Sequence, residues 1–180
     1  DLNALAALVD HRTKIVFIAN PNNPTGTYVN SRELTTFLDR IPRSVIVVVD
    51  EAYYEYTTAD DCPDGIVDLA GRGRLVVLRT FSKAHGLAGL RVGYSISRPD
   101  LTQHLRVAAT PFAVSQIAET AAVTSLDHFG EVVERVQSLV DERDRVTAGL
   151  RDLGWFVPEA QGNFVWLNLG ADSTEFAALA

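Results

Sequence analysis

Three polar clusters contain the side chains of this sequence that could carry out chemistry. They are NPNNPTG (20–26), DEAYYEY (50–56) and RTFSKAHGLAGLR (79–91). The third contains Lys83, which is one of only two lysines in a chain with fourteen arginines. A lysine amine can form a Schiff base with an aldehyde, and a guanidinium does not serve that role. The third cluster is therefore a candidate site for covalent chemistry on a carbonyl group.

The neighbours of Lys83 suit a ligand that is a phosphorylated aldehyde. Thr80 and Ser82 supply hydroxyl groups, and the glycines that follow allow the backbone to approach a ligand closely. Arg91 supplies a planar guanidinium, whose geometry matches a phosphate group. Taken alone, the cluster is also compatible with a glycine-rich turn that exposes a lysine to solvent.

The first two clusters each offer side chains that could bind the same ligand. Asp50 ends a valine-rich run, where a carboxylate is costly to bury unless a cation meets it. It could cap a helix or reach solvent, or it could face the protonated pyridine nitrogen of a pyridoxal cofactor. Tyr53 could direct its phenol into the same pocket or pack against the sheet. Asn23 lies in a turn with two X-Pro steps, which could hold its amide toward a ligand oxygen.

The segments between these clusters predict a sheet that brings them to one edge. The near-continuous apolar runs at 15–19, 45–50 and 75–78 are typical of parallel strands buried on both faces. Ligands bind beyond the carboxyl ends of such strands, so we expect all three clusters to line one edge. The run at 91–96 follows too closely for a helical crossover and could be an antiparallel fourth strand. Between the first two strands, Ser31–Arg40 predicts a helix capped by its serine.

The second half of the chain is expected to be mainly helical rather than an alternation of strands and helices. Its apolar stripe predicts helix from Ser115 to Leu153, ended by Gly154, with strand-like runs on either side of a glycine break in 155–170. The fold class is therefore α/β, a mostly parallel sheet flanked by helices, followed by a long helix and the start of a smaller α+β domain. We place the domain change near residues 111 to 115, with 1–112 as part of the large domain and 113–180 as connecting helices and the first part of the small one.

Composition limits the partners and the location that we expect. The chain has 180 residues, 47% of them hydrophobic, which is enough for a substantial core. Its net charge is -7 without any basic run, which argues against nucleic acid or an anionic membrane and favours small molecules. No spanning segment or secretory signal is apparent, so we expect a cytoplasmic protein. Cys62 is the single cysteine and completes neither an internal disulfide nor a metal site.

Taken together, the motifs resemble a known family of enzymes. The strings NPTG (23–26), DEAY (50–53) and TFSK (80–83), with Arg91 eight residues after the lysine, are similar to the pyridoxal-phosphate-dependent aminotransferases of fold type I. The longer strings NPNNPTG, VDEAYYEY and SKAHGLAGLRVGY most resemble the histidinol-phosphate aminotransferases and their aromatic-amino-acid (phenylalanine) relatives. QGNFVWLNL resembles their small-domain strand, so the resemblance covers essentially the whole chain.

The resemblance implies a role for each matching residue. Lys83 would bind the cofactor covalently and then move a proton, and Asp50 would keep the pyridine nitrogen of pyridoxal phosphate protonated. Asn23 and Tyr53 would hydrogen-bond the phenolic oxygen of the ring. The phosphate would be held by Thr80, Ser82 and Arg91. The implied reaction is a ping-pong transamination of an aromatic or imidazole-bearing amino acid with a 2-oxo acid, in a homodimer.

The sequence also departs from the family pattern and leaves alternatives open. A further phosphate-contacting loop, an aromatic residue that stacks on the ring and an arginine for the substrate carboxylate have no counterpart in residues 1–180, so we expect a piece of a longer enzyme. His85 stands where relatives usually have an aromatic residue, and we expect it to face solvent or to be hydrogen-bonded locally. The motifs are shared by threonine-phosphate decarboxylases, and a non-catalytic cofactor-binding module or an inactive fragment are further alternatives.

Overall fold

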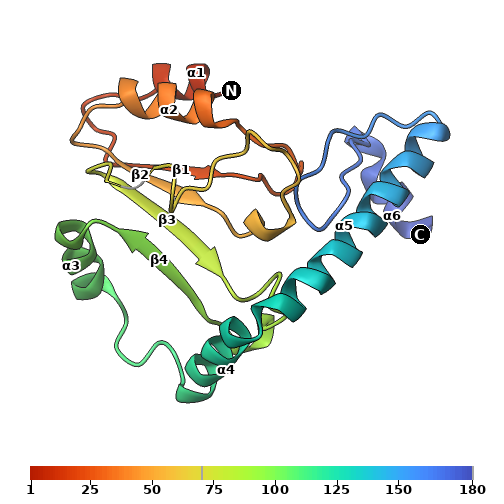
Figure 1. Ribbon diagram of the computed structural model, residues 1–180. Helices are drawn as coiled ribbons and strands as arrows, with labels where there is room; N and C mark the ends of the chain where they lie inside the picture. The colour runs from red at the N-terminus through yellow and green to blue at the C-terminus, as the bar shows by residue number, and fades with distance from the viewer. Residues whose placement is uncertain (70, 180) are drawn as a thin grey trace.

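A four-stranded sheet forms the centre of the protein. The computed structural model describes residues 1–69 and 71–179. The strands β1 (Ile15–Ala19), β2 (Ile46–Asp50), β3 (Leu75–Thr80) and β4 (Gly93–Ser97) lie side by side in that order (Figure 1). The first three are parallel and β4 is antiparallel to β3, which confirms both predictions about strand direction.

Helices lie on both faces of this sheet. Their bounds are α1 (Leu2–Ala7), α2 (Ser31–Arg40), α3 (Pro99–Ala108), α4 (Gln116–Asp127), α5 (Phe129–Asp152) and α6 (Ser173–Leu179). On one face Val47 and Val49 of β2 pack in a core with Leu34 and Phe37 of α2. On the other face Val48 packs with Leu101 of α3, since successive strand side chains point to opposite faces. This arrangement confirms the α/β fold class.

One predicted strand is buried on a single face only. In β1, burial alternates along the strand, and Phe17 is 68% exposed while Val16 and Ile18 are buried. The prediction that all three parallel strands are buried on both faces is therefore wrong for β1. The physical reason is that α3 packs over β2 and β3, and no other described element covers the outer face of β1.

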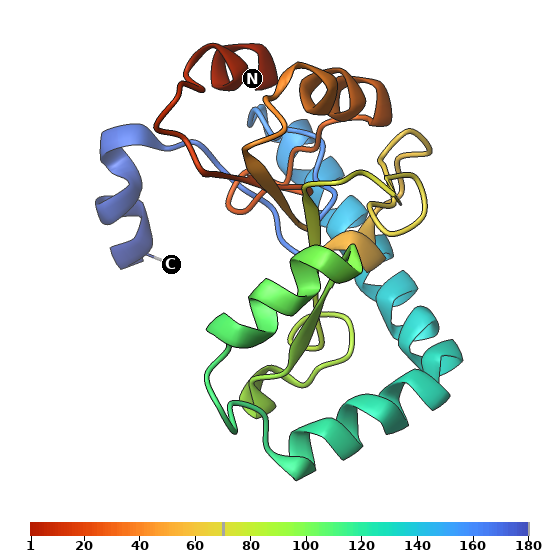
Figure 2. The same ribbon diagram turned by 90° about the vertical axis from the view of Figure 1, so that its left-hand side faces the viewer.

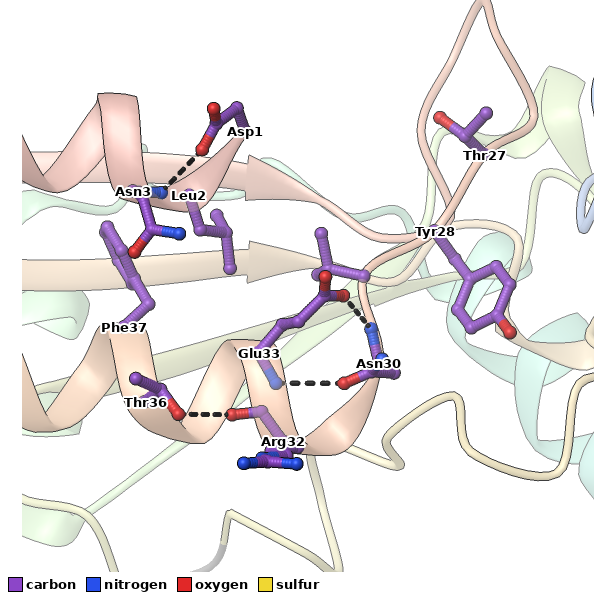
Figure 3. A pocket seen from close by; sticks show the side chains of 11 residues that line it. Asp1, Leu2, Asn3, Thr27, Tyr28, Asn30, Arg32, Glu33, Thr36 and Phe37 are labelled. Carbon is purple, nitrogen blue, oxygen red and sulfur yellow. Dashed lines mark hydrogen bonds between the residues drawn. The ribbon is translucent and has the colours of Figure 1, made fainter.

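The N-cap of helix α2 lies one residue before the predicted Ser31 and belongs to a capping box. Asn30, rather than Ser31, is the N-cap: its side chain accepts a hydrogen bond from the backbone N–H of Glu33 at 2.9 Å. The Glu33 carboxylate accepts in return from the backbone N–H of Asn30 at 2.9 Å (Figure 3). The reciprocal pair satisfies two N–H groups that the start of a helix leaves free, which fixes the starting residue.

The predicted helix from Ser115 to Leu153 is two helices. Ser115 caps α4, since its hydroxyl accepts from the backbone N–H of Ala118 at 3.1 Å. The chain turns at His128, and α5 leaves at an angle to α4 (Figure 2). Gly154, with a φ of 88°, then ends the helical segment as expected.

The C-terminal part of the chain differs from its prediction. Residues 155–169 contain no strand in the part of the chain that the structure describes, so the strand prediction is wrong there. An extended segment counts as a strand only when a neighbour pairs with it, and no described segment does so. Residues 109–115 also lack regular structure. None of the described helices combines the length and the apolar character needed to cross a membrane.

Candidate active site

The carboxyl ends of the strands bring the three polar clusters to one edge of the sheet. Asp50 is the last residue of β2, and Thr80 is the last residue of β3. The backbone ladder continues past the strands, because Asn20 N–H donates to the Asp50 carbonyl at 2.9 Å and Glu51 N–H donates to the Leu78 carbonyl at 3.0 Å. Each cluster therefore starts at a position fixed by hydrogen bonds to its neighbour.

Asn23 and Tyr53 are hydrogen-bonded to each other at this edge, and Lys83 lies near the Tyr53 ring. The Asn23 Nδ2 group donates a hydrogen bond to the Tyr53 hydroxyl at 2.7 Å. The Lys83 Nζ atom lies 5.1 Å from the centroid of the Tyr53 ring. A phenol that accepts one hydrogen bond still has its own proton to donate. Tyr53 can therefore donate to an oxygen of a ligand that binds beside Lys83.

Asp50 is half-buried and has one oxygen in use. Its Oδ1 atom accepts from the backbone N–H of Ala52 at 3.1 Å, a turn that follows the end of β2. Its Oδ2 atom has no hydrogen-bond partner among the described residues. A half-buried carboxylate with one such oxygen is suited to meet a cationic group of a ligand.

Of the three residues predicted to bind phosphate, two share a turn and the third is bound elsewhere in the loop. Thr80 and Ser82 share one turn, in which the Thr80 hydroxyl accepts from the backbone N–H of Ser82 at 3.1 Å. Arg91 follows the short 3-10 helix Ala88–Leu90 in a left-handed conformation, with a φ of 53°. Its Nη1 atom donates to the Ala88 carbonyl at 2.7 Å. The guanidinium is thus bound to its own loop rather than to the Thr80 turn.

The loop that carries Lys83 is held in place from two directions. Leu87 N–H donates to the Phe81 carbonyl at 2.8 Å, and Gly86, with a φ of 70°, provides the left-handed turn between them. From α5, the Arg135 guanidinium donates to the Ala84 carbonyl at 2.7 Å. The backbone on either side of Lys83 is therefore fixed while its side chain remains exposed.

His85 is hydrogen-bonded locally and buried. Its Nδ1 atom lies 2.8 Å from the Ser125 hydroxyl of α4, and its ring packs against Phe81 with centroids 4.6 Å apart. Burial, followed by the nearby charge of Arg135, lowers the pKa of His85 below its usual value. This residue joins the Lys83 loop to α4 and does not contact the other predicted site residues.

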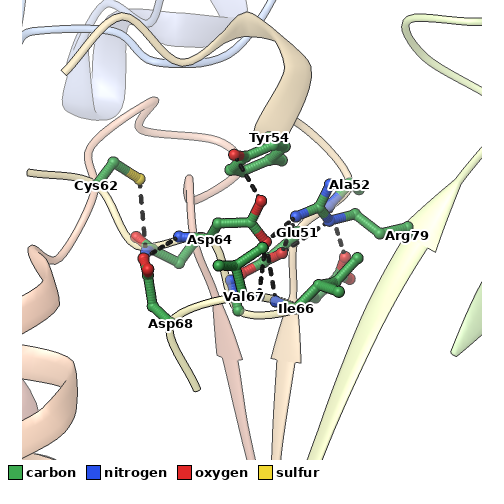
Figure 4. Close-up of polar contacts among 12 residues, drawn as sticks. Glu51, Ala52, Tyr54, Cys62, Asp64, Ile66, Val67, Asp68 and Arg79 are labelled. Carbon is green, nitrogen blue, oxygen red and sulfur yellow. Dashed lines mark hydrogen bonds and ion pairs between the residues drawn. The ribbon is translucent and has the colours of Figure 1, made fainter. Parts of the chain in front are cut away.

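A buried ion pair behind the strand ends was not foreseen from the sequence. Arg79 Nε donates to the Glu51 Oε2 atom at 2.7 Å, and the Arg79 Nη2 atom lies 2.6 Å from the same oxygen (Figure 4). The other oxygen of Glu51 accepts from the backbone N–H of Gly65 at 2.7 Å, and a β-carbon at Gly65 would overlap it. Burial raises the pKa of Glu51 to about 7, against the opposing effect of Arg79. The sequence offers only a weak signal for this pair: Glu51 directly follows Asp50, and Arg79 directly precedes Thr80.

Two further side chains extend this buried network. Asp64 Oδ1 lies 3.0 Å from Arg79 Nη2, and the Tyr54 hydroxyl donates to Asp64 Oδ2 at 2.8 Å. The guanidinium also lies over the Tyr54 ring, 3.7 Å from its centroid. Burial and the bond to Asp64 raise the pKa of Tyr54 to about 12. The network fixes the loop that follows β2 to the end of β3.

The segment after α5 also reaches the site, through residues that sequence reasoning did not select. The ring of Phe164 packs edge-on against Tyr53, with centroids 5.1 Å apart and planes at 84°. Gln161 is 1% exposed and bonds the loops of the first two clusters. By contrast, a hollow of about 820 Å³ between α1, α2 and residues 27–30 is lined by none of the predicted site residues (Figure 3).

Comparison with known proteins places this arrangement in a family. The model of the family described as aminotransferase class I and II matches residues 1–179. The chain belongs to this family. An aromatic amino acid aminotransferase from Streptomyces avermitilis is 53% identical to this aminotransferase chain over 178 residues, covering 99% of the chain and 50% of that relative.

Solved structures agree with this family assignment. Histidinol-phosphate aminotransferase from Sinorhizobium meliloti, in complex with pyridoxal-5'-phosphate, superposes with a TM-score of 0.89 at 31% identity, covering 99% of this chain and 49% of that one. L-threonine-O-3-phosphate decarboxylase from Porphyromonas gingivalis superposes with a TM-score of 0.74 at 28% identity, covering 93% of this chain and 52% of that one. The aminotransferase chain thus spans about half the length of the relatives that it matches.

Proposed function

We propose that the protein transaminates an aromatic or imidazole-bearing amino acid with a 2-oxo acid, using pyridoxal phosphate. The observation that carries the proposal is the grouping of Asn23, Tyr53 and Lys83 at the edge of the sheet where β2 ends in Asp50. Similarity to aromatic amino acid aminotransferases supports the aromatic substrate, and similarity to a histidinol-phosphate aminotransferase supports the imidazole-bearing alternative.

The side chains at the strand ends fit this cofactor. When bound, pyridoxal phosphate supplies an electron-withdrawing ring that weakens the bonds at the α-carbon of an amino acid. The Oδ2 atom of Asp50 would accept from the ring nitrogen and keep it protonated. Asn23 and Tyr53 would donate to the phenolic oxygen. The phosphate would be bound by Thr80, Ser82 and Arg91, with Arg91 giving up its bond to the Ala88 carbonyl.

Lys83 would have two tasks in succession. Its Nζ atom would attach the cofactor through the aldehyde and, once the substrate has replaced it, would take the proton from the substrate α-carbon. The rigid backbone around Lys83 would keep that atom within reach of both positions. The cofactor would hold the amino group of the first substrate until the second substrate, a 2-oxo acid, accepts it. The first product would leave before the second substrate binds, which is the order of a ping-pong reaction.

The domain boundary and the assembly are part of the same proposal. Residues 1–112 would belong to the large, cofactor-binding domain, and 113–180 to the connecting helices and the small domain. The irregular segment at 109–115 supports a boundary there. We expect a cytoplasmic homodimer, and light scattering after size-exclusion chromatography would measure the assembly directly.

Decarboxylation is the second candidate function. It is supported by the likeness to a threonine-phosphate decarboxylase, and the bond that breaks depends on how the substrate is oriented above the ring. Half-reaction rates with phenylalanine, histidinol phosphate and threonine phosphate would separate the candidates. Carbon dioxide released from threonine phosphate, without formation of a 2-oxo acid, would identify the decarboxylase.

Replacement of Lys83 tests the central assignment. Lys83→Ala should abolish the visible absorbance band of lysine-bound cofactor and reduce turnover by a factor of roughly 10⁴ or more. Lys14→Ala is the matched control, because Lys14 is the other lysine and lies at the opposite end of β1. Equal absorbance and turnover in both variants would refute the assignment. A lysine-dependent band without turnover on any amino acid would instead indicate a cofactor-binding module.

A further inference from the structure

We propose that Gln161 is a positioning residue, which holds the Asn23–Tyr53 pair at the geometry needed to donate to the phenolic oxygen of the cofactor. The inference rests on the proposed function, since it concerns the same site. Gln161 touches neither Asn23 nor Tyr53. It acts through the two loops that carry them.

The side chain of Gln161 is buried and its acceptor is fully used. Its Oε1 atom accepts from the backbone N–H of Thr58 at 2.6 Å and from that of Ala59 at 3.1 Å. Its Nε2 atom donates to Glu159 at 3.1 Å. Two backbone N–H groups, one on the exposed Thr58 and one on the half-buried Ala59, therefore share one buried amide oxygen from more than a hundred residues later in the chain. Losing that oxygen would leave both without an acceptor.

The backbone at Gln161 binds the other loop. Gln161 N–H donates to the Gly26 carbonyl at 2.8 Å. A β-carbon at Gly26 would lie 3.0 Å from the β-carbon of Ala160, so the two segments are in close contact. Gly26 is three residues from Asn23, within the same rigid turn. One residue thus bonds the loop that carries Asn23 and the segment that follows Tyr53.

Helix α5 also bonds the segment after Tyr53 to the segment that contains Gln161. Arg143 is 5% exposed, and its Nη1 atom donates to the Tyr56 carbonyl at 3.0 Å and to the Gly162 carbonyl at 3.2 Å. These bonds join the residues after Tyr53 to the residue after Gln161. Phe164 then packs edge-on against the Tyr53 ring. The contacts together fix Tyr53 from both ends of the segment 160–164.

Displacement of the two donors would have a measurable electronic effect. Donors to the phenolic oxygen stabilise its anionic form, so they lower the pH at which the lysine-bound cofactor loses its proton. If the Asn23–Tyr53 pair shifts, that oxygen becomes more basic and the pH midpoint of the visible absorbance change rises. A residue with a purely structural role would lower stability without moving this midpoint.

The variants separate the acceptor of Gln161 from its bulk. Gln161→Leu is similar in size but cannot accept from Thr58 or Ala59. Gln137→Leu is the matched control, since Gln137 is exposed on α5 and bonds only Asp141, at 2.8 Å. If Gln161→Leu does not fold, Gln161→Ala carries the same expectation.

The first measurement is the pH titration of the visible band in the protein loaded with pyridoxal phosphate. We expect Gln161→Leu to raise the midpoint by about half a unit or more, with Gln137→Leu close to the parent. An unchanged midpoint in Gln161→Leu, with or without a lower melting temperature, would overturn the inference.

The second measurement needs no cofactor and separates this inference from the proposed function. Amide hydrogen exchange in the cofactor-free protein should become at least about tenfold faster in 22–28 and 56–59 for Gln161→Leu, and remain parental for Gln137→Leu. If the parent shows no visible band, the proposed function fails and exchange alone decides the positioning role. Unchanged exchange in both segments would refute that role.

Discussion

Replacing Arg79 with methionine should destabilise the protein in a way that depends on pH. Arg79→Met keeps an unbranched side chain but leaves Glu51, which is 0% exposed, without its cation. At pH 9, where Glu51 is ionised in the parent, the variant should lose about 3–5 kcal/mol of unfolding free energy. At pH 6 Glu51 is mostly protonated, and the loss should be about 1–3 kcal/mol from hydrogen bonds alone.

The direction follows from the raised pKa of Glu51. A carboxyl whose folded pKa is about 7, against an ordinary 4.5, favours folding at low pH, and this contribution is lost as pH rises through 7. Removing Arg79 raises the folded pKa further, so the loss continues to higher pH in the variant. The difference from the parent should therefore grow above pH 7, by up to about 1.4 kcal/mol per pH unit.

Urea unfolding at pH 6 and pH 9 measures this difference. Arg72→Met is the matched control, because Arg72 pairs with Asp39 at 2.6 Å near the surface and should cost under about 1 kcal/mol at both pH values. Adding Glu51→Gln to Arg79→Met should remove the extra pH dependence. A destabilisation by Arg79→Met that is the same at pH 6 and pH 9 would refute the reasoning.

Two other predictions test local features of the fold. Asn30→Ala should cost about 1 kcal/mol by removing the N-cap of α2, and Ser31→Ala much less, as measured by thermal unfolding; the reverse order would restore Ser31 as the cap. Gly26→Ala should cost more than about 1 kcal/mol, because Gly26 has a φ of 74° and abuts Ala160. Gly149→Ala, in open space on α5, should instead stabilise by about 0.5–1 kcal/mol, and equal effects at the two glycines would contradict the argument.

The sheet was predictable because its signals are local. Apolar runs of four to six residues indicated the strands, and the short connection after Lys83 leaves no room for a helical crossover, which favoured an antiparallel β4. The cap of α2 was misplaced because Asn30 and Ser31 are both good caps. The spacing to Glu33 decides between them, since a capping box needs its acid three residues after the cap. The strand prediction at 155–170 failed because pairing depends on a neighbour that a local pattern does not reveal.

Part of the candidate site could also be predicted from local signals, and part of it could not. Asn23, Asp50, Tyr53 and Lys83 could be predicted together because each follows a parallel strand, and parallel strands end at one edge. Gln161 could not be selected in this way. Its partners at Thr58 and Ala59 are backbone groups, which carry no residue-type signal, and they lie 103 and 102 positions away.

Helix α5 has a consequence for any motion of this site. Arg135 donates a hydrogen bond to the loop of Lys83, and Arg143 donates one to the segment beside Gln161. The two arginines are eight residues apart on the same helix, which is about 12 Å. A helix is stiff over that length, so the two arginines keep a fixed spacing along it. A displacement of α5 would therefore act on the loop of Lys83 and on the segment beside Gln161 together, as long as both arginines keep their hydrogen bonds.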